Sequence, residues 1–214
     1  MPLRLRVAGK LPSIPLLAVI GSRKPMSSSL VSTGWIVDAA VSSGWGVVSG
    51  GALGVDGVAH DACLQRSGVT MVVLGSGLMQ AYPPEHANMF AKVVAGGGCL
   101  VSEYHDHAPP RPWRFPHRNR LISAFAHAVA VVQAGERSGS MSTARIAADH
   151  HGRPLMVVPG SVEDPSWKGS NRLIRDGAIV INDHLDVQAA LALQHASAVA
   201  DTCDDKESSD DHGK

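Results

Sequence analysis

The sequence predicts an α/β fold: a doubly wound, mostly parallel sheet of the extended Rossmann-like type, in a single domain. Short apolar segments recur along the chain, and segments with helical periodicity separate them. The apolar segments are nearly continuous rather than alternating, which is typical of strands buried on both faces of a parallel sheet. Their alternation with helices indicates a sheet of about seven strands with helices on both sides.

Seven segments are predicted to be strands, because each is a short apolar run that ends at glycine or a polar residue. They lie at residues 16–21, 46–50, 70–75, 99–104, 128–133, 154–160 and 178–182. Helices are predicted where apolar residues recur every three or four positions. They lie at residues 30–43, 56–67, 85–94, 118–126, 142–150 and 185–200. Two connections, residues 104–119 and 160–175, are long for a compact domain, and such loops are usually functional.

Composition predicts a globular protein of the cytoplasm. Of the 214 residues 44% are hydrophobic and 18% are charged, which excludes a disordered chain. The sequence has no apolar run of membrane-spanning length and no signal-peptide core at its start, so we expect no membrane association. Its three cysteines are far apart, which argues against a disulfide framework and against a cysteine metal site. We expect no metal and no cofactor.

Charge is balanced over the whole chain but divided unevenly along it. Residues 201–214 hold six acidic residues and no aliphatic or aromatic one, so they are predicted to form a disordered acidic tail. Residues 1–200 carry 17 basic and 13 acidic residues, a net charge of +4. The expected organisation is an N-terminal extension at 1–15, a Rossmann-like domain at 16–200 and the tail. A basic body suggests an anionic partner.

Glycine-rich turns follow four of the predicted strands. They contain the following residues: Gly21, Ser22 and Arg23; Gly50 and Gly51; Gly75, Ser76 and Gly77; Arg137, Ser138, Gly139 and Ser140. The carboxyl ends of parallel strands meet at one edge of a sheet, where ligands bind. Glycines allow a ligand to approach the backbone, and helix N-termini attract anions. The turns therefore predict a phosphate-binding edge, with Arg23 and Arg137 adding fixed positive charge.

Standard nucleotide and catalytic motifs are missing or incomplete. The chain contains neither a P-loop nor a G-x-G-x-x-G fingerprint, so ATP and NAD are not the expected ligands. Asp56 and His60 stand four residues apart on a predicted helix and could act as an acid and base, but Asp56 is equally a residue favoured at a helix N-terminus. No catalytic residue is assigned.

The proline-rich segment 109–120 interleaves four arginines with two aromatic residues. Arginine neutralises phosphates while aromatic rings stack on bases, a combination typical of sequence-tolerant single-strand binding. Arg118, Asn119 and Arg120 are therefore predicted to contact phosphates, and Trp113 and Phe115 to stack on bases. The alternative is that the two rings fold back onto the core.

Nine separated motifs together resemble the DNA-processing protein A family, also called DprA or Smf. They are Gly21-Ser22-Arg23, Ser49 to His60, Val73 to Gly77, Tyr82 to His86, Ser102 to Tyr104, Arg118 to Ser123, Ser138 to Arg145, Val158 to Gly160 and Asn171 to Ala178. The resemblance runs from about residue 16 to 187 and implies a Rossmann-like domain without catalytic activity. It implies that the chain binds and protects single-stranded DNA and loads a RecA-type recombinase during DNA uptake. It also implies that Arg23 and Arg137 matter for binding, and that a homodimer is plausible.

A second interpretation is a nucleotide-binding or phosphoribohydrolase-like member of the related Rossmann-like superfamily. The catalytic motif of those enzymes would fall on residues 137–145, where Arg145 stands in place of the catalytic carboxylate. Loss of that carboxylate argues against hydrolysis, whereas nucleotide binding without hydrolysis stays open.

Overall fold

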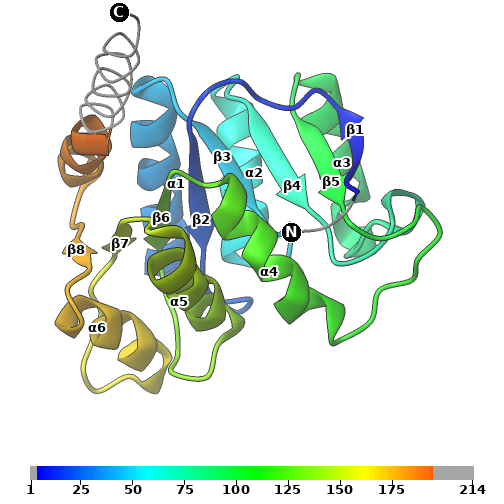
Figure 1. Cartoon of the computed structure of the whole chain (residues 1–214). Coiled ribbons are helices and arrows are strands. Elements are labelled where there is room, and N and C mark those ends of the chain that lie inside the picture. The colour runs from blue at the N-terminus through cyan, green and yellow to red at the C-terminus, as the bar shows by residue number, and fades with distance from the viewer. Residues whose placement is uncertain (1–3, 195–214) are drawn as a thin grey trace, which may run out of the picture.

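The computed structural model describes residues 4–194, which form one eight-stranded sheet with helices on both faces (Figure 1). The strand order is β1-β5-β4-β3-β2-β6-β7-β8. The strands are β1 (Arg6–Gly9), β2 (Leu16–Ile20), β3 (Gly46–Ser49), β4 (Thr70–Val73), β5 (Cys99–Ser102), β6 (Ala128–Val131), β7 (Leu155–Val157) and β8 (Ile179–Val180). All pairs are parallel except β1 with β5. The predicted fold class is confirmed, and so are all seven predicted strands.

Helices cover the two faces in two groups. The helices are α1 (Ser27–Ser42), α2 (Val55–Gln65), α3 (Ala87–Ala95), α4 (Arg114–Phe125), α5 (Gly139–His151) and α6 (Lys168–Arg175), with 3-10 turns η1 (Leu78–Gln80), η2 (Pro84–His86) and η3 (Pro165–Trp167). Residues 184–194 are also helical. In Figure 1, α4 and α5 lie in front of the sheet, with α1 and α2 behind it.

Alternation along the central strand divides the core between these groups. Leu17 and Val19 of β2 belong to the cluster that includes α1 and α2, whereas Leu16, Ala18 and Ile20 belong to the cluster that includes α4 and α5. All five side chains are buried. A strand buried on both sides has no polar alternation, which is why its sequence is a continuous apolar run.

The structure adds two elements that the sequence analysis did not predict and moves the start of a third. β1 lies within the segment expected to be an extension, and it pairs with β5 at the edge of the sheet. α6 occupies much of the expected connection 160–175. α4 begins at Arg114, four residues before the predicted start at residue 118, so the end of the connection 104–119 is helical. The end of the last predicted helix and the acidic tail lie outside the described residues.

The sheet has its topological switch point between β2 and β6. β2 pairs with β3 on one side and with β6 on the other, and the helices that follow β2 and β6 lie on opposite faces. The loops after these two strands therefore diverge and leave a crevice at the carboxyl ends, where ligands bind in sheets of this kind. No helix within residues 4–194 is long and apolar enough to cross a membrane.

Candidate nucleic-acid interface

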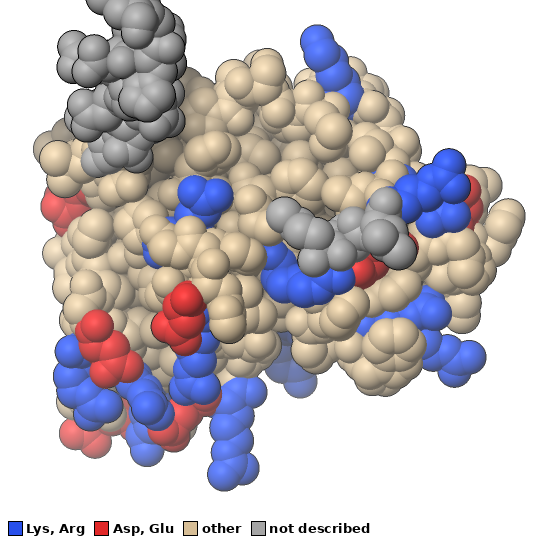
Figure 2. Space-filling view, in the orientation of Figure 1, with Lys and Arg blue, Asp and Glu red and all other residues tan. Residues whose placement is uncertain are grey.

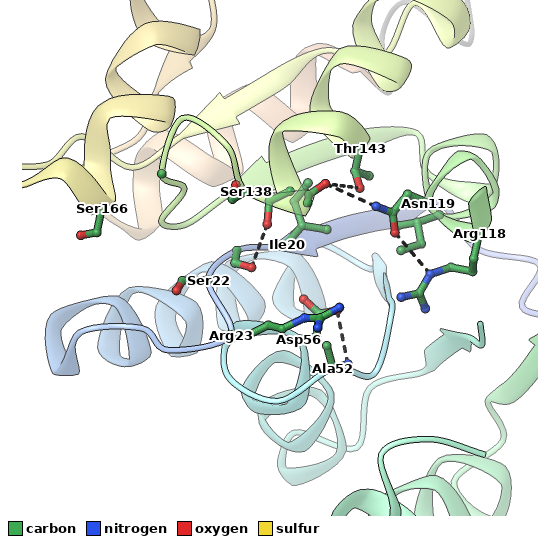
Figure 3. Close-up of a pocket in the computed structure, with 15 residues that line it drawn as sticks. Ile20, Ser22, Arg23, Ala52, Asp56, Arg118, Asn119, Ser138, Thr143 and Ser166 are labelled. Carbon is green, nitrogen blue, oxygen red and sulfur yellow. Dashed lines mark hydrogen bonds between the residues drawn. The ribbon is translucent and has the colours of Figure 1, made fainter. Parts of the chain in front are cut away.

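A cleft of about 570 Å³ lies at this switch point (Figure 3). Loops from β2, β3 and β6 and one face of α4 form its walls. Its lining residues are Ile20, Gly21, Ser22, Arg23, Ala52, Asp56, Arg118, Asn119, Ile122, Gly135, Ser138, Gly139, Ser140, Thr143 and Ser166. The predicted glycine-rich turns after β2 and β6 thus meet at one cavity, although more than a hundred residues separate them in sequence.

The N-terminus of α5 points its free backbone amides into the cleft. Ser138 is the N-cap residue, but its side chain makes no capping hydrogen bond, and no acidic residue occupies the first turn. The Ser138 hydroxyl is buried and has no partner among the described residues. The Ser140 hydroxyl donates to the carbonyl oxygen of Gly21 over 2.8 Å, which ties α5 to the β2 loop. An uncapped helix N-terminus of this kind is an anion-binding site.

Arg23 brings positive charge to the opposite wall. Its guanidinium lies 5.7 Å from the centre of the Phe115 ring. The ion pairs formed among the described residues involve other arginines and histidines, and none includes Arg23. The positive charge of Arg23 is therefore uncompensated and available to an anion in the cleft.

Asp56, in the first turn of α2, holds the β3–α2 loop in place. A carboxylate oxygen of Asp56 accepts hydrogen bonds from the amides of Gly50 (3.1 Å) and Ala52 (3.4 Å). Gly54 has φ +85°, and a Cβ there would collide with the Ser22 carbonyl oxygen, so the loop requires glycine at this position. Burial raises the pKa of Asp56, and nearby Arg118 opposes that effect. These hydrogen bonds make Asp56 a structural residue of the loop.

Arg118 lines the cleft but is almost fully buried. It is 4% exposed, and its guanidinium donates to the Gly50 carbonyl over 2.7 Å and to the Val73 carbonyl. Burial lowers the pKa of Arg118 to about 10, although the neighbouring Asp56 favours the charged form. The residue predicted to grip phosphate thus joins the ends of β3 and β4 to α4. Asn119, in contact with Arg118, donates to the Gly139 carbonyl (3.3 Å) and links α4 to α5 (Figure 3).

A side pocket of about 220 Å³ opens from the cleft. It shares Arg23, Ala52 and Arg118 with the cleft, and its other lining residues are Lys24, Gly50, Leu53, Tyr82, Pro83 and Phe115. The Tyr82 and Phe115 rings lie 5.7 Å apart at an angle of 50°. Leu53 and Tyr82 were not predicted as site residues. Tyr82 belongs to the family motif Tyr82 to His86, but only the packing of the η1–η2 segment against α4 brings its ring close to that of Phe115.

Four predicted residues line neither the cleft nor the side pocket. Arg137 is exposed between Gly135 and Ser138, both of which line the cleft. Arg120 forms an ion pair with Glu103 instead. Trp113 is 61% exposed, so it does not fold back onto the core.

Gly51 is the fourth of these residues. It is buried with φ +68°, and its carbonyl lies 3.0 Å from Nδ1 of His86. Gly51 therefore shapes the turn after β3 instead of lining the cleft.

Positive charge extends along the edge that carries the cleft. Figure 2 shows Lys and Arg side chains that project from the lower edge of the molecule, the edge at which the parallel strands end. Acidic side chains are interspersed with basic ones at the lower left, over α6. Among the described residues, no group of three or more His, Cys, Asp or Glu side chains could hold a metal ion.

Comparisons with known proteins give a consistent family. Residues 1–192 match the family model of DNA recombination-mediator protein A. Protein Smf of Escherichia coli K12 is 41% identical over 170 residues, which cover 78% of this chain and 44% of that protein. DNA processing protein DprA of Bacillus subtilis is 36% identical over 77% of this chain and 55% of that protein. The chain spans about half the length of these relatives.

Solved structures agree with this result. The crystal structure of DprA from Streptococcus pneumoniae has a TM-score of 0.81 at 34% identity, covering 88% of this chain and 66% of that one. A Helicobacter pylori structure, described as showing the single-stranded DNA binding mode of DprA, has a TM-score of 0.80 at 31% identity and covers 89% of this chain and 87% of that one. A molybdenum cofactor carrier protein from Chlamydomonas reinhardtii, 18% identical with a TM-score of 0.60, shares the fold. The nine motifs, the sheet and the family match together show that this chain belongs to the DNA recombination-mediator protein A (DprA/Smf) family.

Proposed function

We propose that the chain binds single-stranded DNA, with phosphates in the cleft and a base in the side pocket. The observation that carries this proposal is the junction of the two cavities at Arg23. One cavity offers an uncapped helix N-terminus and an unpaired arginine, whereas the other offers Tyr82, Phe115 and Leu53. Phosphates fit the first and nucleobases the second. The single-strand binding named for the Helicobacter pylori protein agrees with this assignment.

Each predicted residue then has a distinct role. Arg23 and the backbone amides of Gly139 and Ser140 hold one phosphate, while Gly21, Ser22 and Gly50 leave room for the DNA backbone. Arg137, on the rim, contacts the next phosphate. Arg118, Asn119 and Gly51 shape the loops, and Arg120 orders the β5–α4 segment through Glu103. A base can enter the side pocket only when it is unstacked, so the site selects single strands over duplex.

The wider role follows from family membership and is proposed with it. The chain would protect incoming single strands and load a RecA-type recombinase during DNA uptake and recombination, as a cytoplasmic homodimer. We propose that it does so without catalysis, cofactor or metal. The domain responsible is assigned to residues 16–200 together with β1, and residues 201–214 are assigned to an acidic tail.

Anisotropy of labelled oligo-dT, titrated at several salt concentrations, tests the DNA proposal. The logarithm of the binding constant should fall with the logarithm of salt concentration by about 0.7 per neutralised phosphate. Arg23→Glu/Arg137→Glu should weaken binding by about a hundredfold and flatten this slope, because two phosphate contacts are lost.

Arg175→Glu is the matched control for charge reversal. Arg175 is an exposed arginine at the end of α6, whose nearest acidic group is Asp176, and it does not line the cleft. This variant should bind like the wild-type protein. Equal affinity of the double variant and the control would refute the assignment of the cleft, and equal affinity for duplex would refute strand selection.

Nucleotide binding is the second candidate, because the anion site and the adjacent aromatic pocket also match a mononucleotide. Hydrolysis would need a free catalytic carboxylate in the cleft, and the structure does not support one. Asp56 is the one acidic residue among those lining the cleft, and its carboxylate accepts hydrogen bonds from the backbone amides of Gly50 and Ala52. Arg145 lines a different cavity, beside α6. Thymidine monophosphate added to the same titration separates the two candidates. Competition at concentrations close to those of oligo-dT would favour the nucleotide.

A further inference from the structure

A second aromatic surface lies beside the side pocket, at the start of α4. The Trp113 ring stands edge-on to the Tyr104 ring, with centroids 6.3 Å apart. The Arg114 guanidinium lies over both rings, 4.5 Å from the centre of Tyr104 and 5.2 Å from that of Trp113. We refer to Tyr104, Trp113 and Arg114 as the aromatic platform.

The platform is held in place before any ligand arrives. Arg114 donates to the Pro109 carbonyl over 2.7 Å. The Tyr104 amide donates to the Ser102 hydroxyl (3.0 Å), and the Tyr104 hydroxyl lies 3.2 Å from Nδ1 of His117. Groups fixed in this way lose little conformational entropy on binding. The arrangement is therefore suited to recognition.

Core packing does not explain the exposed ring of the platform. Trp113 belongs to none of the hydrophobic clusters formed by residues 4–194, and it is 61% exposed. A tryptophan that keeps an open ring beside an arginine offers stacking and positive charge together. Nucleobases on a phosphate backbone are the partners that use both.

The platform continues the path of the proposed single-strand site. Phe115, which lines the side pocket, follows Trp113 by two residues, and residues two apart at a helix start face different sides. One short segment thus presents one ring to the side pocket and another to the surface beyond it. A strand leaving the side pocket over the start of α4 passes the platform next.

We propose that the aromatic platform is a second stacking site, for a base of the same strand whose phosphates occupy the cleft. This inference rests on the proposed single-strand binding and extends it. A short oligonucleotide would occupy the cleft and side pocket alone. A longer one would also reach Trp113, and its affinity would depend on that ring.

Oligonucleotides of two lengths test the platform. We would measure the affinity of the full chain for oligo-dT of about 6 and about 20 nucleotides, a range that spans known single-strand site sizes. Trp113→Ala should weaken binding of the longer strand by about fivefold or more, the loss typical of one stacked base. It should leave the shorter strand unchanged, and Trp113→Phe should restore most of the lost affinity.

Leu185→Ala is the matched control, because Leu185 is 69% exposed and belongs to the distant last helix. It should bind both lengths like the wild-type protein. Equal losses for both lengths in Trp113→Ala, or no loss for the longer one, would overturn the platform while single-strand binding stands. Failure of the wild-type protein to bind either length would instead overturn the proposed function itself.

Discussion

Arg118 illustrates how a residue of the expected type can serve a binding site chiefly by holding its loops in place. In the sequence it belongs to a group of arginines that predicts a phosphate-binding surface. In the structure it is 4% exposed and bonded to the carbonyls of Gly50 and Val73. A buried arginine bonded to carbonyl groups fixes the ends of two strands. Its effect on DNA passes through the shape of the β3–α2 loop.

Arg118→Met should therefore reduce stability and affinity but leave the salt dependence of binding intact. Loss of the guanidinium leaves two buried carbonyls without a donor, so we expect a loss of about 2–4 kcal/mol in the free energy of unfolding, measured with urea. DNA affinity of the folded variant should fall, with an unchanged salt slope. A slope reduced by about 0.7 would mean that Arg118 contacts a phosphate after all.

At the N-terminus of α5, the residue that best stabilises the helix differs from the residue that best allows DNA to bind. Ser138 is an N-cap residue without a side-chain capping bond, and it faces the cleft. A carboxylate at this position favours the helix, because it caps the free amides and interacts well with the helix dipole. The same charge would repel phosphate. Helix stability and anion binding thus favour different residues here.

Ser138→Asp should raise the free energy of unfolding by about 0.3–1 kcal/mol and weaken oligo-dT binding by about tenfold or more. Ser138→Asn is the control, since it caps equally well without charge. It should match the stability gain in part and bind DNA far better than the aspartate variant. Equal DNA affinity of the two variants would show that no phosphate lies at this helix end.

Elements were predictable where burial on both faces shapes the sequence. Strands β2 to β7 are of this kind, whereas β8 is exposed and was recognisable by its apolar residues alone. The loops after β2 and β6 were recognisable because glycine and serine follow β2 directly and follow β6 after a short gap. β1 was not predictable, because its residues alternate between half-buried and exposed and begin with Arg6. α6 has five charged or polar residues among eight and follows a proline-containing turn, so it resembles a loop.

Side-chain partners from distant segments were the unpredictable part of the site. Tyr82 meets Phe115 only because η1 and η2 fold against the start of α4. In the same way, the burial of Arg118 depends on the packing of α4 across β3 and β4, which sequence spacing does not describe.

The free energy of unfolding of the whole molecule should depend on pH because of His60. This residue is fully buried on α2; its Nδ1 lies 2.7 Å from the Thr70 hydroxyl, which itself donates to the Val47 carbonyl. The Thr70 hydroxyl must therefore accept from His60, which places the proton on Nδ1. Burial, with smaller effects from His86 and Arg118, lowers the pKa of His60 from 6.5 to about 3.

Because the unfolded chain binds this proton first, the free energy of unfolding should fall as pH drops below about 6.5 and should continue falling toward about 3. The His60 contribution amounts to about 2 kcal/mol between about pH 7 and pH 5, since each pH unit in that range costs up to about 1.36 kcal/mol. Urea unfolding at a series of pH values measures it. His60→Gln keeps a donor toward Thr70 but cannot titrate, so its curve should be flatter by that amount. Parallel curves for the two proteins would mean that His60 is not the source of the acid sensitivity, which would then come from other titratable groups.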